Sequence, residues 1–355
     1  MTLTAVSLFS GMGGDSLGIE RSGLKLAGYS EKESIICKTH EMNFKNCELI
    51  GNNGDITKIP DDEFYKYHGI DLLFAGFPCQ GFSQAGKKKV DDPRNTLSRE
   101  FVRATKCMEP QYVIGENVKG LLTRKTSDNR NYIDVIVEEF DRIGYKVMYK
   151  VFKCHKYGIP QKRERLIIVG MRKCSVYNNF PNFPTEMDIA TNLKDIVSFD
   201  MYGAKYMRNI DFDMSSIPDE CMLVDMDDDS GENNVHPYLQ MKIDGEKVYN
   251  NKEYSTLFSF GKRASPIHCE IIDIRKPCKT IICTYDHQPR LFVPLRNKNG
   301  YYIRPLLVDE LKQIQGFPKY YKIAGTVKQQ IIQIGNAVPP PLIEKIVRNL
   351  EMAVC

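Results

Sequence analysis

The stretch Ala5-Val6-Ser7-Leu8-Phe9-Ser10-Gly11-Met12-Gly13-Gly14 decides the fold class of this chain. Residues 5–9 form a short apolar run that is typical of a buried strand, and the glycines after it predict a tight loop. Helical spacing follows from about residue 16 to residue 21. A strand, a glycine loop and a helix in this order are the first unit of an α/β fold, in which the loop backbone can approach a ligand closely.

The same alternation continues to about residue 171. Strands are expected at 24–30, 71–75, 111–115, 145–152 and 165–169, and helices at 33–44, 95–108 and 132–143. The run Leu72–Ala75 is continuously apolar, as in a parallel strand that is buried on both faces. We therefore predict a Rossmann-like, doubly wound sheet.

The later part of the chain is less regular. No clear period survives between residues 172 and 272, which predicts a second, smaller and irregular domain. Helical spacing returns at 307–315 and 341–352. We expect three parts: a cofactor-binding domain at 1–171, the irregular domain at 172–272, and a segment at 273–355 that returns to the first domain.

Composition narrows the class of protein. The chain has 355 residues, 42% of them hydrophobic and 26% charged, which is typical of a globular protein that buries a core without disulfides. No apolar run is long enough to span a membrane, and the first residues show no secretory leader pattern. The 11 cysteines include no CxxC pair, so neither a zinc ribbon nor a disulfide framework is expected. These features predict a cytoplasmic protein without a bound metal.

Acidic residues follow the glycine loop at informative distances. Glu31 ends the second predicted strand about twenty residues on, where a carboxylate can accept hydrogen bonds from ribose hydroxyls. Asp55 and Ile56 stand at a third loop, where an acid could hold an adenine amino group. The spacing favours a nucleoside-carrying cofactor. A tight turn with ordinary surface acids is the alternative.

Three further motifs stand at strand ends. Gly76-Phe77-Pro78-Cys79-Gln80 follows the third strand, where α/β enzymes bind ligands, and Glu116-Asn117-Val118 ends the next one. The carboxylate would lie near the thiol if the two strands are neighbours. Gln161-Lys162-Arg163-Glu164-Arg165 precedes the last strand and could bind phosphate or orient a base. Each motif alone also fits a purely structural interpretation. The cysteine would then be a buried thiol, the glutamate a helix-capping acid, and the basic motif a solvated run of charges.

Together these motifs, in this order and followed by Gly335-Asn336-Ala337-Val338-Pro339, closely resemble the DNA (cytosine-5) methyltransferases of bacteria, phages and viruses. The resemblance covers residues 1–171 and about 273–350. It implies an S-adenosylmethionine-dependent enzyme that methylates C5 of a flipped-out cytosine in a short specific sequence of double-stranded DNA. By position, it makes 172–272 the target recognition domain.

The resemblance also assigns residues. Cys79 would be the nucleophile that adds to C6, Glu116 the acid that contacts the target ring, and Arg163 and Arg165 the basic pair beside them. The cofactor pocket would be lined by Phe9, Gly11, Gly13, Gly14, Glu31, Asp55, Ile56, Pro78 and Asn336. DNA contacts are expected from Gln80, Ser83, Lys87, Lys88, Lys89, Arg94 and Asn117. In many relatives an aromatic residue follows the acid at Glu31, but here the position is Lys32.

Several alternatives stay open from the sequence. A tRNA cytosine-5 methyltransferase would share the fold and the cysteine, a nicotinamide oxidoreductase would share the glycine loop, and a catalytically inactive scaffold would only bind DNA. A monomer is expected, with a restriction endonuclease as a genetic rather than a physical partner.

Overall fold

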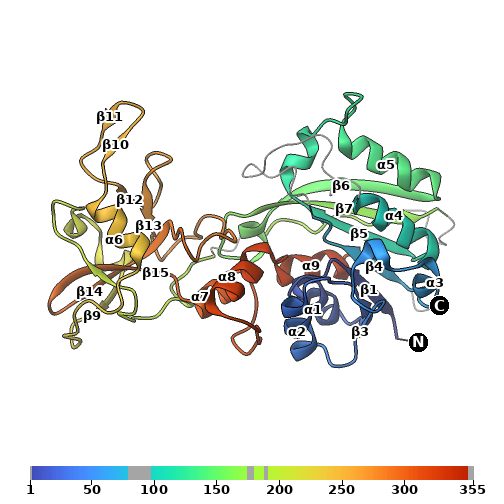
Figure 1. The fold of residues 1–355 in the computed structure, drawn as a ribbon, viewed down its shortest axis with the longest axis horizontal. Coiled ribbons are helices and arrows are strands. Elements are labelled where there is room, and N and C mark those ends of the chain that lie inside the picture. Colours follow the sequence, from blue (N-terminus) through green and yellow to red (C-terminus); the bar gives the residue numbers. More distant parts are fainter. Residues whose placement is uncertain (1, 79–96, 174–179, 188–190, 351–355) are drawn as a thin grey trace.

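The computed structural model describes residues 2–78, 97–173, 180–187 and 191–350. Within these residues, seven strands form one sheet in the order β3-β2-β1-β4-β5-β7-β6 (Figure 1). Their bounds are β1 Thr4–Leu8, β2 Lys25–Tyr29, β3 Glu48–Leu49, β4 Leu72–Ala75, β5 Tyr112–Asn117, β6 Tyr145–Lys153 and β7 Glu164–Arg172. Strands β1 to β5 are parallel to one another, whereas β7 is antiparallel to both β5 and β6. The predicted Rossmann-like sheet is confirmed, and the antiparallel β6–β7 edge is an addition that the pattern did not predict.

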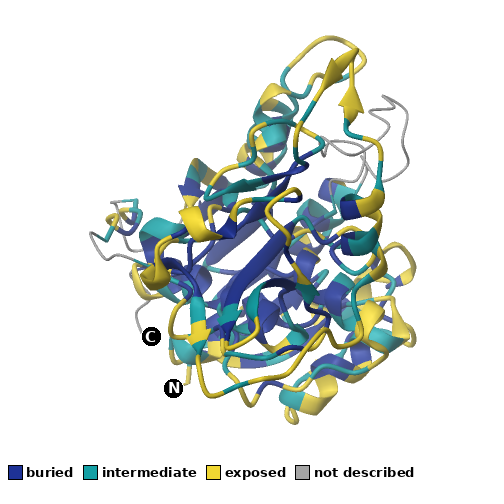
Figure 2. Cartoon of the chain, turned by 90° about the vertical axis from the view of Figure 1, so that its left-hand side faces the viewer, coloured by how far each residue is buried: buried dark blue, intermediate teal, exposed yellow. Residues whose placement is uncertain are grey.

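Helices cover both faces of this sheet. They are α1 Gly14–Arg21, α2 Ser34–Asn43, α3 Asp61–Tyr65, α4 Leu97–Met108, α5 Tyr132–Arg142, α7 Val308–Ile314, α8 Val327–Asn336 and α9 Pro340–Arg348. Short 3-10 helices lie at η1 Ile56–Lys58, η3 Lys119–Thr123 and η4 Cys154–Tyr157. The inner strands β1, β4, β5 and β7 lie at the centre of the large lobe and are mostly buried, whereas the edge strand β6 is largely exposed or half-buried and the helices expose their outer faces (Figure 2).

Alternation along the strands divides the interior into two cores. Ala5 of β1 packs in a core with Ile19 of α1 and Ile343 of α9. Leu8 of β1 points to the opposite face and packs in a second core with Phe101 of α4. Side chains that alternate in this way are expected of a strand covered by helices on both sides.

A smaller lobe follows β7 and contains a second sheet (Figure 1). Among the described residues its strands run β12-β13-β14-β15-β8, with β9 paired to β14. The bounds are β8 Lys205–Tyr206, β9 Leu223–Asp225, β12 Phe258–Phe260, β13 Cys269–Ile271, β14 Leu291–Asn297 and β15 Gly300–Pro305. The lobe also holds α6 Pro237–Asp244, a separate hairpin of β10 Val248–Tyr249 and β11 Lys252–Glu253, and the 3-10 helices η5 Met214–Ser216 and η6 Asp219–Cys221. Most of these strands are only two or three residues long, which explains why no period was visible in the sequence.

The predicted domain boundary at residue 272 does not coincide with a structural boundary. Strands β14 and β15 lie beyond it, yet they pair within the sheet of the small lobe. Phe292 packs in the core of the small lobe, whereas its neighbour Val293 packs in the core that includes α1 and α9. The two lobes therefore share β14, and the small lobe extends to about residue 305.

The C-terminal helices return to the large lobe, as expected. α9 lies beside α1, and Ile346 and Val347 pack in the same core as Ile19. The approach is closest at the glycine loop, where an added Cβ on Gly14 would lie 2.0 Å from the carbonyl oxygen of Val338. Only glycine allows the two backbones to meet at this point.

Candidate active site

Glu116 and Arg165 form a close ion pair at one edge of the seven-stranded sheet. Glu116 lies near the carboxyl end of β5, and Arg165 lies near the start of β7, the antiparallel neighbour of β5. The Nε of Arg165 is 2.6 Å from Oε1 of Glu116, and the side chains are 14% and 11% exposed. A charge-assisted bond of this length in a partly desolvated place is strong, so the acid and the guanidinium are held as one unit.

The strand that leads to Cys79 is the direct neighbour of β5. β4 and β5 are parallel, with Ala75 opposite Gly115. The segment after Ala75 therefore leaves the sheet beside Glu116, as the sequence analysis required for contact between the acid and the thiol. The structure describes this segment as far as Pro78, which is half-buried. Cys79 itself lies outside the described residues.

Asn117 fixes the position of this segment through hydrogen bonds of its side-chain amide. Its Nδ2 donates to the carbonyl oxygen of Phe77 at 3.1 Å, and its Oδ1 accepts from the N–H of Val118 at 2.8 Å. The residue is 2% exposed. Its amide is bound to backbone through both the nitrogen and the oxygen, so it positions the segment that leads to Cys79, and the expected contact of Asn117 with DNA stays a prediction. The other expected DNA contacts, Gln80, Ser83, Lys87, Lys88, Lys89 and Arg94, lie outside the described residues.

Arg163 differs from Arg165 in its surroundings. It is 1% exposed, and its guanidinium donates to the carbonyl oxygens of Ile281, Gly335 and Ala337 at 3.1 to 3.2 Å. Burial lowers the pKa of Arg163, and the neighbouring charge of Arg165 lowers it further. These hydrogen bonds connect the start of β7 to Ile281 and to the C-terminal segment, so Arg163 positions backbone in this structure, and its expected catalytic role stays a prediction.

Two glutamines strengthen the same connection, and the sequence analysis did not predict their contact. Gln161 is fully buried, and its Nε2 donates to Oε1 of Gln315 at 2.7 Å. Its Oε1 accepts from the N–H of Ile281 at 2.9 Å. Gln315 in turn donates to the carbonyl of Ala337. Gln161 stands in a quoted motif and Gln315 in a stretch with helical spacing, but neither pattern reveals which residues the side chains will contact.

The glycine loop and the end of β2 are joined by Glu31. One carboxylate oxygen accepts from the N–H of Gly11 at 3.1 Å, and the other accepts from the N–H of Glu33 at 2.9 Å. Gly11 has φ +54°, and no atom lies within 4 Å of the place where its Cβ would be. Phe9 also has a positive φ of 55°, which is rare for a bulky side chain and marks strain at functional sites. Open space beside a glycine, next to a carboxylate, fits a nucleoside-carrying cofactor such as S-adenosylmethionine.

The remaining cofactor candidates fall into two groups. Asn336 ends α8 and is exposed, and the side chain of Asp55 is 24% exposed while it caps η1 by accepting from the N–H of Thr57 at 3.2 Å. By contrast, an added Cβ atom on Gly13 or Gly14 would meet protein atoms. On Gly13 it would lie 2.4 Å from the ring of Phe44.

Ile56 is 4% exposed and packs in the second core, with Leu8. Its side chain packs against protein in this structure, and its expected place in the cofactor pocket stays a prediction. Lys32 is exposed.

A buried polar cluster beneath the glycine loop was missed. The carboxylate of Asp15 is 1% exposed and accepts a short hydrogen bond from the hydroxyl of Ser7. Ser16 lies 2.9 Å from the hydroxyl of Ser10 and 3.1 Å from Nε2 of His40. Burial raises the pKa of Asp15 to about 7, and burial lowers the pKa of His40 to about 3. A polar residue after a glycine loop gives no signal of burial in the sequence, so only the fold reveals this cluster.

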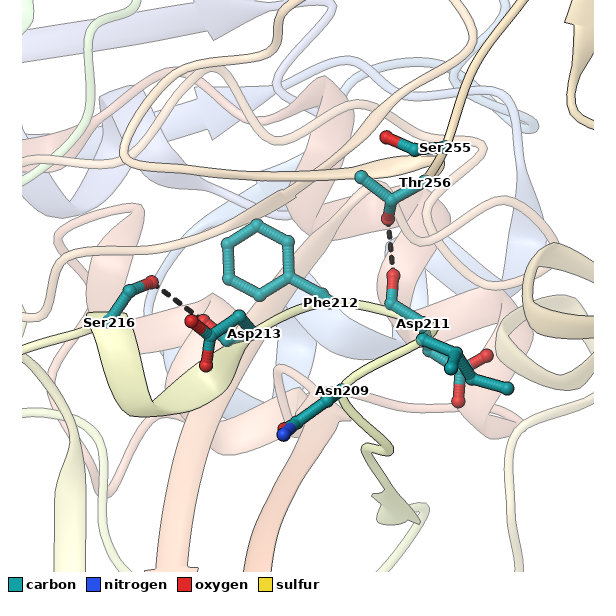
Figure 3. A pocket seen from close by; sticks show the side chains of 8 residues that line it. Asn209, Asp211, Phe212, Asp213, Ser216, Ser255 and Thr256 are labelled. Atoms are coloured by element: carbon teal, nitrogen blue, oxygen red, sulfur yellow. Dashed lines mark hydrogen bonds between the residues drawn. The ribbon is translucent and has the colours of Figure 1, made fainter.

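One pocket lies away from this site, in the small lobe (Figure 3). It has a volume of about 260 Å³ and is formed by residues 209–213, Ser216 and residues 255–256. Ser216 donates to the carbonyl of Asp213 at 2.6 Å, and Thr256 donates to the carbonyl of Asp211. The polar groups of the pocket largely satisfy one another. In the part of the chain that the structure describes, no helix is long and apolar enough to cross a membrane.

Comparison with known proteins agrees with this geometry. The sequence profile of C-5 cytosine-specific DNA methylases matches residues 3–352. Type II methyltransferase M1.HphI of Haemophilus parahaemolyticus is 32% identical over 354 residues, which cover 98% of this chain and 86% of that protein. M.FnuDI of Fusobacterium nucleatum is 31% identical, with 98% and 93% covered.

Solved structures share the fold. A DNA modification methyltransferase encoded within an Escherichia coli prophage has a TM-score of 0.64 at 23% identity, with 98% of each chain covered. A DNMT2 of Spodoptera frugiperda has a TM-score of 0.66 at 16% identity, with 98% of this chain and 99% of that one covered.

Proposed function

The chain belongs to the C-5 cytosine-specific DNA methylases, and from this premise we propose which of its residues carry the reaction. As a member of that family it transfers a methyl group from S-adenosylmethionine to C5 of cytosine in double-stranded DNA. This membership leaves no place for a nicotinamide oxidoreductase, and the tRNA alternative fits less well. The observation that carries the residue assignment is the Glu116–Arg165 pair, one strand away from the segment that leads to Cys79.

Cys79 is the nucleophile in this proposal. Cytosine C5 is too weak a nucleophile to take a methyl group directly, so a thiolate adds to C6 and makes C5 electron-rich. The positive charge of Arg165 favours the thiolate. After methyl transfer, loss of the proton at C5 and expulsion of the thiolate give 5-methylcytosine.

Glu116 and Arg165 stabilise the charge that builds on the ring. When Cys79 adds to C6, negative charge develops on the N3 and O2 side. Glu116, after it has taken up a proton from the solvent, relieves this charge by donating that proton to N3, and Arg165 holds O2 through a guanidinium N–H that is not used by Glu116. Because Nε of Arg165 already contacts the carboxylate, both groups are positioned before the base arrives.

S-adenosylmethionine supplies the sulfonium methyl group when it is bound. We propose that Gly11, Phe9, Glu31, Asp55, Pro78 and Asn336 surround it. Glu31 accepts from ribose hydroxyls, the backbone at Gly11 passes close to the cofactor, and Asn336 covers it from the C-terminal segment. Gly13 and Gly14 contribute backbone only, since their Cα faces are packed against protein.

The target base has to leave the duplex to reach this site, at a cost of a few kcal/mol. We propose that the small lobe reads the recognition sequence in the major groove while the loop after Cys79, with Gln80, Ser83, Lys87–Lys89 and Arg94, contacts the DNA. We further propose that a monomer acts, because one cytosine is handled at a time. Its endonuclease partner, if it belongs to a restriction system, is a genetic one.

The test is bisulfite-type sequencing of a plasmid from cells that express the protein. We expect 5-methylcytosine at one short repeated sequence with the wild type and none with Cys79→Ala, which should still bind DNA. Methylation by the Cys79→Ala variant would overturn the nucleophile assignment. An unmodified plasmid with folded wild-type protein would instead direct the search to tRNA as substrate.

A further inference from the structure

Three lysines converge around one histidine beside the catalytic strand, and none of them belongs to the expected DNA contacts. Lys153 ends β6, Lys156 lies in η4, and Lys162 immediately precedes Arg163. We propose that Lys153, Lys156 and Lys162, with His155, bind a phosphate of the DNA backbone next to the flipped cytosine. The proposal rests on the function proposed above and adds to it a site for the backbone of the substrate.

The position of the cluster follows from strand register. Lys153 is opposite Glu164 and Phe152 is opposite Arg165 in the β6–β7 pair. The cluster is therefore within one or two residues of the guanidinium that contacts Glu116. A phosphate that flanks an extruded nucleotide has to lie close to the pocket that receives the base, so this is where such a contact is needed.

The backbone that carries the lysines is held in place. The N–H of Cys154 donates to the carbonyl of Arg163 at 2.8 Å, and the N–H of Lys162 donates to the carbonyl of Cys278 at 2.8 Å. The carbonyl of Lys156 accepts from the N–H of Met187 at 2.8 Å. These bonds join η4, the start of β7 and two other segments, so the charges sit on a fixed frame rather than on a free loop.

The charges of the cluster are not balanced within the described part of the chain. Nearby cations have carboxylate partners there: Lys119 pairs with Glu164 at 3.1 Å, and Lys279 pairs with Glu270 at 2.8 Å. None of the three cluster lysines has such a partner among the described residues, and Lys153 and Lys162 are exposed. Like charges held together repel one another, and a bound anion removes that repulsion.

The surroundings of His155 show the effect of the positive charge of the three lysines. Its Nδ1 is buried and has no hydrogen-bond partner among the described residues. Burial lowers the pKa of His155, and the charges of Lys156, Lys162 and Lys153 lower it further, against a smaller opposing effect of Glu186. The ring of His155 therefore senses the positive charge of the three lysines, and a phosphate bound by those lysines would reduce that charge.

The first test measures how DNA binding depends on salt. Each phosphate contact contributes about 0.9 to the slope of log affinity against log salt concentration. The triple variant Lys153→Gln, Lys156→Gln, Lys162→Gln removes one phosphate contact, so it should lose about 0.9 from the size of this slope, equally on target and non-target duplexes. The matched control changes Lys25, Lys38 and Lys45 to Gln, which removes the same charge from exposed positions around β2 and α2. The control should keep the wild-type slope.

The second test follows the proton signal of the His155 ring by NMR, assigned with His155→Gln. A bound phosphate should raise the pKa of His155 when a duplex is added. Inorganic phosphate alone should produce the shift only weakly, if the site depends on the DNA backbone.

A triple variant that folds, binds S-adenosylmethionine and has the same slope as the control would refute the phosphate site while leaving the methyltransferase activity intact. Wild-type protein that fails to methylate DNA would instead refute the function on which the proposal rests.

Discussion

The ion pair of Glu116 and Arg165 shows how two single residues share one task. Either charge alone would be left unpaired in a partly buried place, which is costly. Together they hold an acid and a donor 2.6 Å apart at the strand end next to the segment that leads to Cys79. Arg163, only two positions from Arg165, is used to connect segments instead. The two arginines of one motif thus have different partners: Arg163 lies just before β7 and donates to backbone carbonyls, whereas Arg165 lies within β7 and pairs with Glu116.

Replacing Glu116 by Gln tests the chemical part of this pair. Gln keeps the size and a carbonyl oxygen for Arg165 but cannot donate an acidic proton. We expect single-turnover methyl transfer to slow by about 100- to 10,000-fold, the range of general acid catalysis, with modest loss of DNA affinity in a gel-shift assay. An unchanged rate would remove Glu116 from the mechanism.

Asp15 leads to a prediction about stability and pH. Its pKa is about 7 in the folded protein and 3.8 ordinarily, so the folded protein holds the proton more tightly. The stabilisation that results is present at low pH and is lost as pH rises from about 4 to 7. Asp15→Asn cannot ionise, so it should raise the free energy of unfolding at pH 8 by up to about 4 kcal/mol.

Urea denaturation at pH 5 and pH 8 measures this difference. The gain of Asp15→Asn over the wild type should shrink to less than half at pH 5, where the wild-type carboxyl is protonated when folded. His40 acts in the opposite direction, because its lowered pKa makes the folded state lose stability as pH falls below about 6.5. That loss is common to both proteins and cancels in the comparison. An equal gain at both pH values would contradict the assigned titration.

At the scale of elements, the glycine loop depends on a partner from the other end of the chain. The N-terminal end of α1 packs against the backbone of Val338, and Tyr321 donates to the carbonyl of Met12. The loop is therefore not an independent strand–loop–helix unit. Residues about 300 positions later in the chain help to fix its shape.

Gly14→Ala tests this dependence. The new Cβ would lie 2.0 Å from the carbonyl oxygen of Val338, and backbone cannot yield cheaply. Overpacking of this kind costs about 1 to 3 kcal/mol, so thermal unfolding should occur at lower temperature. Calorimetry should also show weaker S-adenosylmethionine binding, because the segment that carries Asn336 is displaced. Gly231→Ala, with no atom within 4 Å of the new Cβ, is the control and should change neither property.

At the scale of the whole molecule, the two lobes are joined by packed strands and not by a free linker. Alternate residues of β14 enter different cores, with Phe292 in the small lobe and Val293 and Leu295 in the large one. Arg163 adds a second connection, since it binds both Ile281 and Ala337. The orientation of the small lobe toward the catalytic edge is therefore built into the shared core.

The sequence predicted the large lobe well because its elements carry their own signals. The run Leu72–Ala75 is wholly buried, as a continuous apolar run predicts. Expected and observed bounds of α2, β4 and β6 differ by at most one residue at each end. The small lobe could not be read in this way, because strands of two or three residues such as β8 and β13 are too short to show a period.

By itself, the sequence determined the family, the α/β class and the strand ends at which Glu116 and Arg165 stand, since motif order and hydrophobic period are local properties. Only the tertiary structure decided what each side chain touches. It showed that Arg163 and Asn117 position backbone, that Ile56 is core, and that Lys153, Lys156 and Lys162 gather around His155. These contacts join residues far apart in the chain or from different elements, and strand pairing and packing, which no local pattern encodes, bring them together.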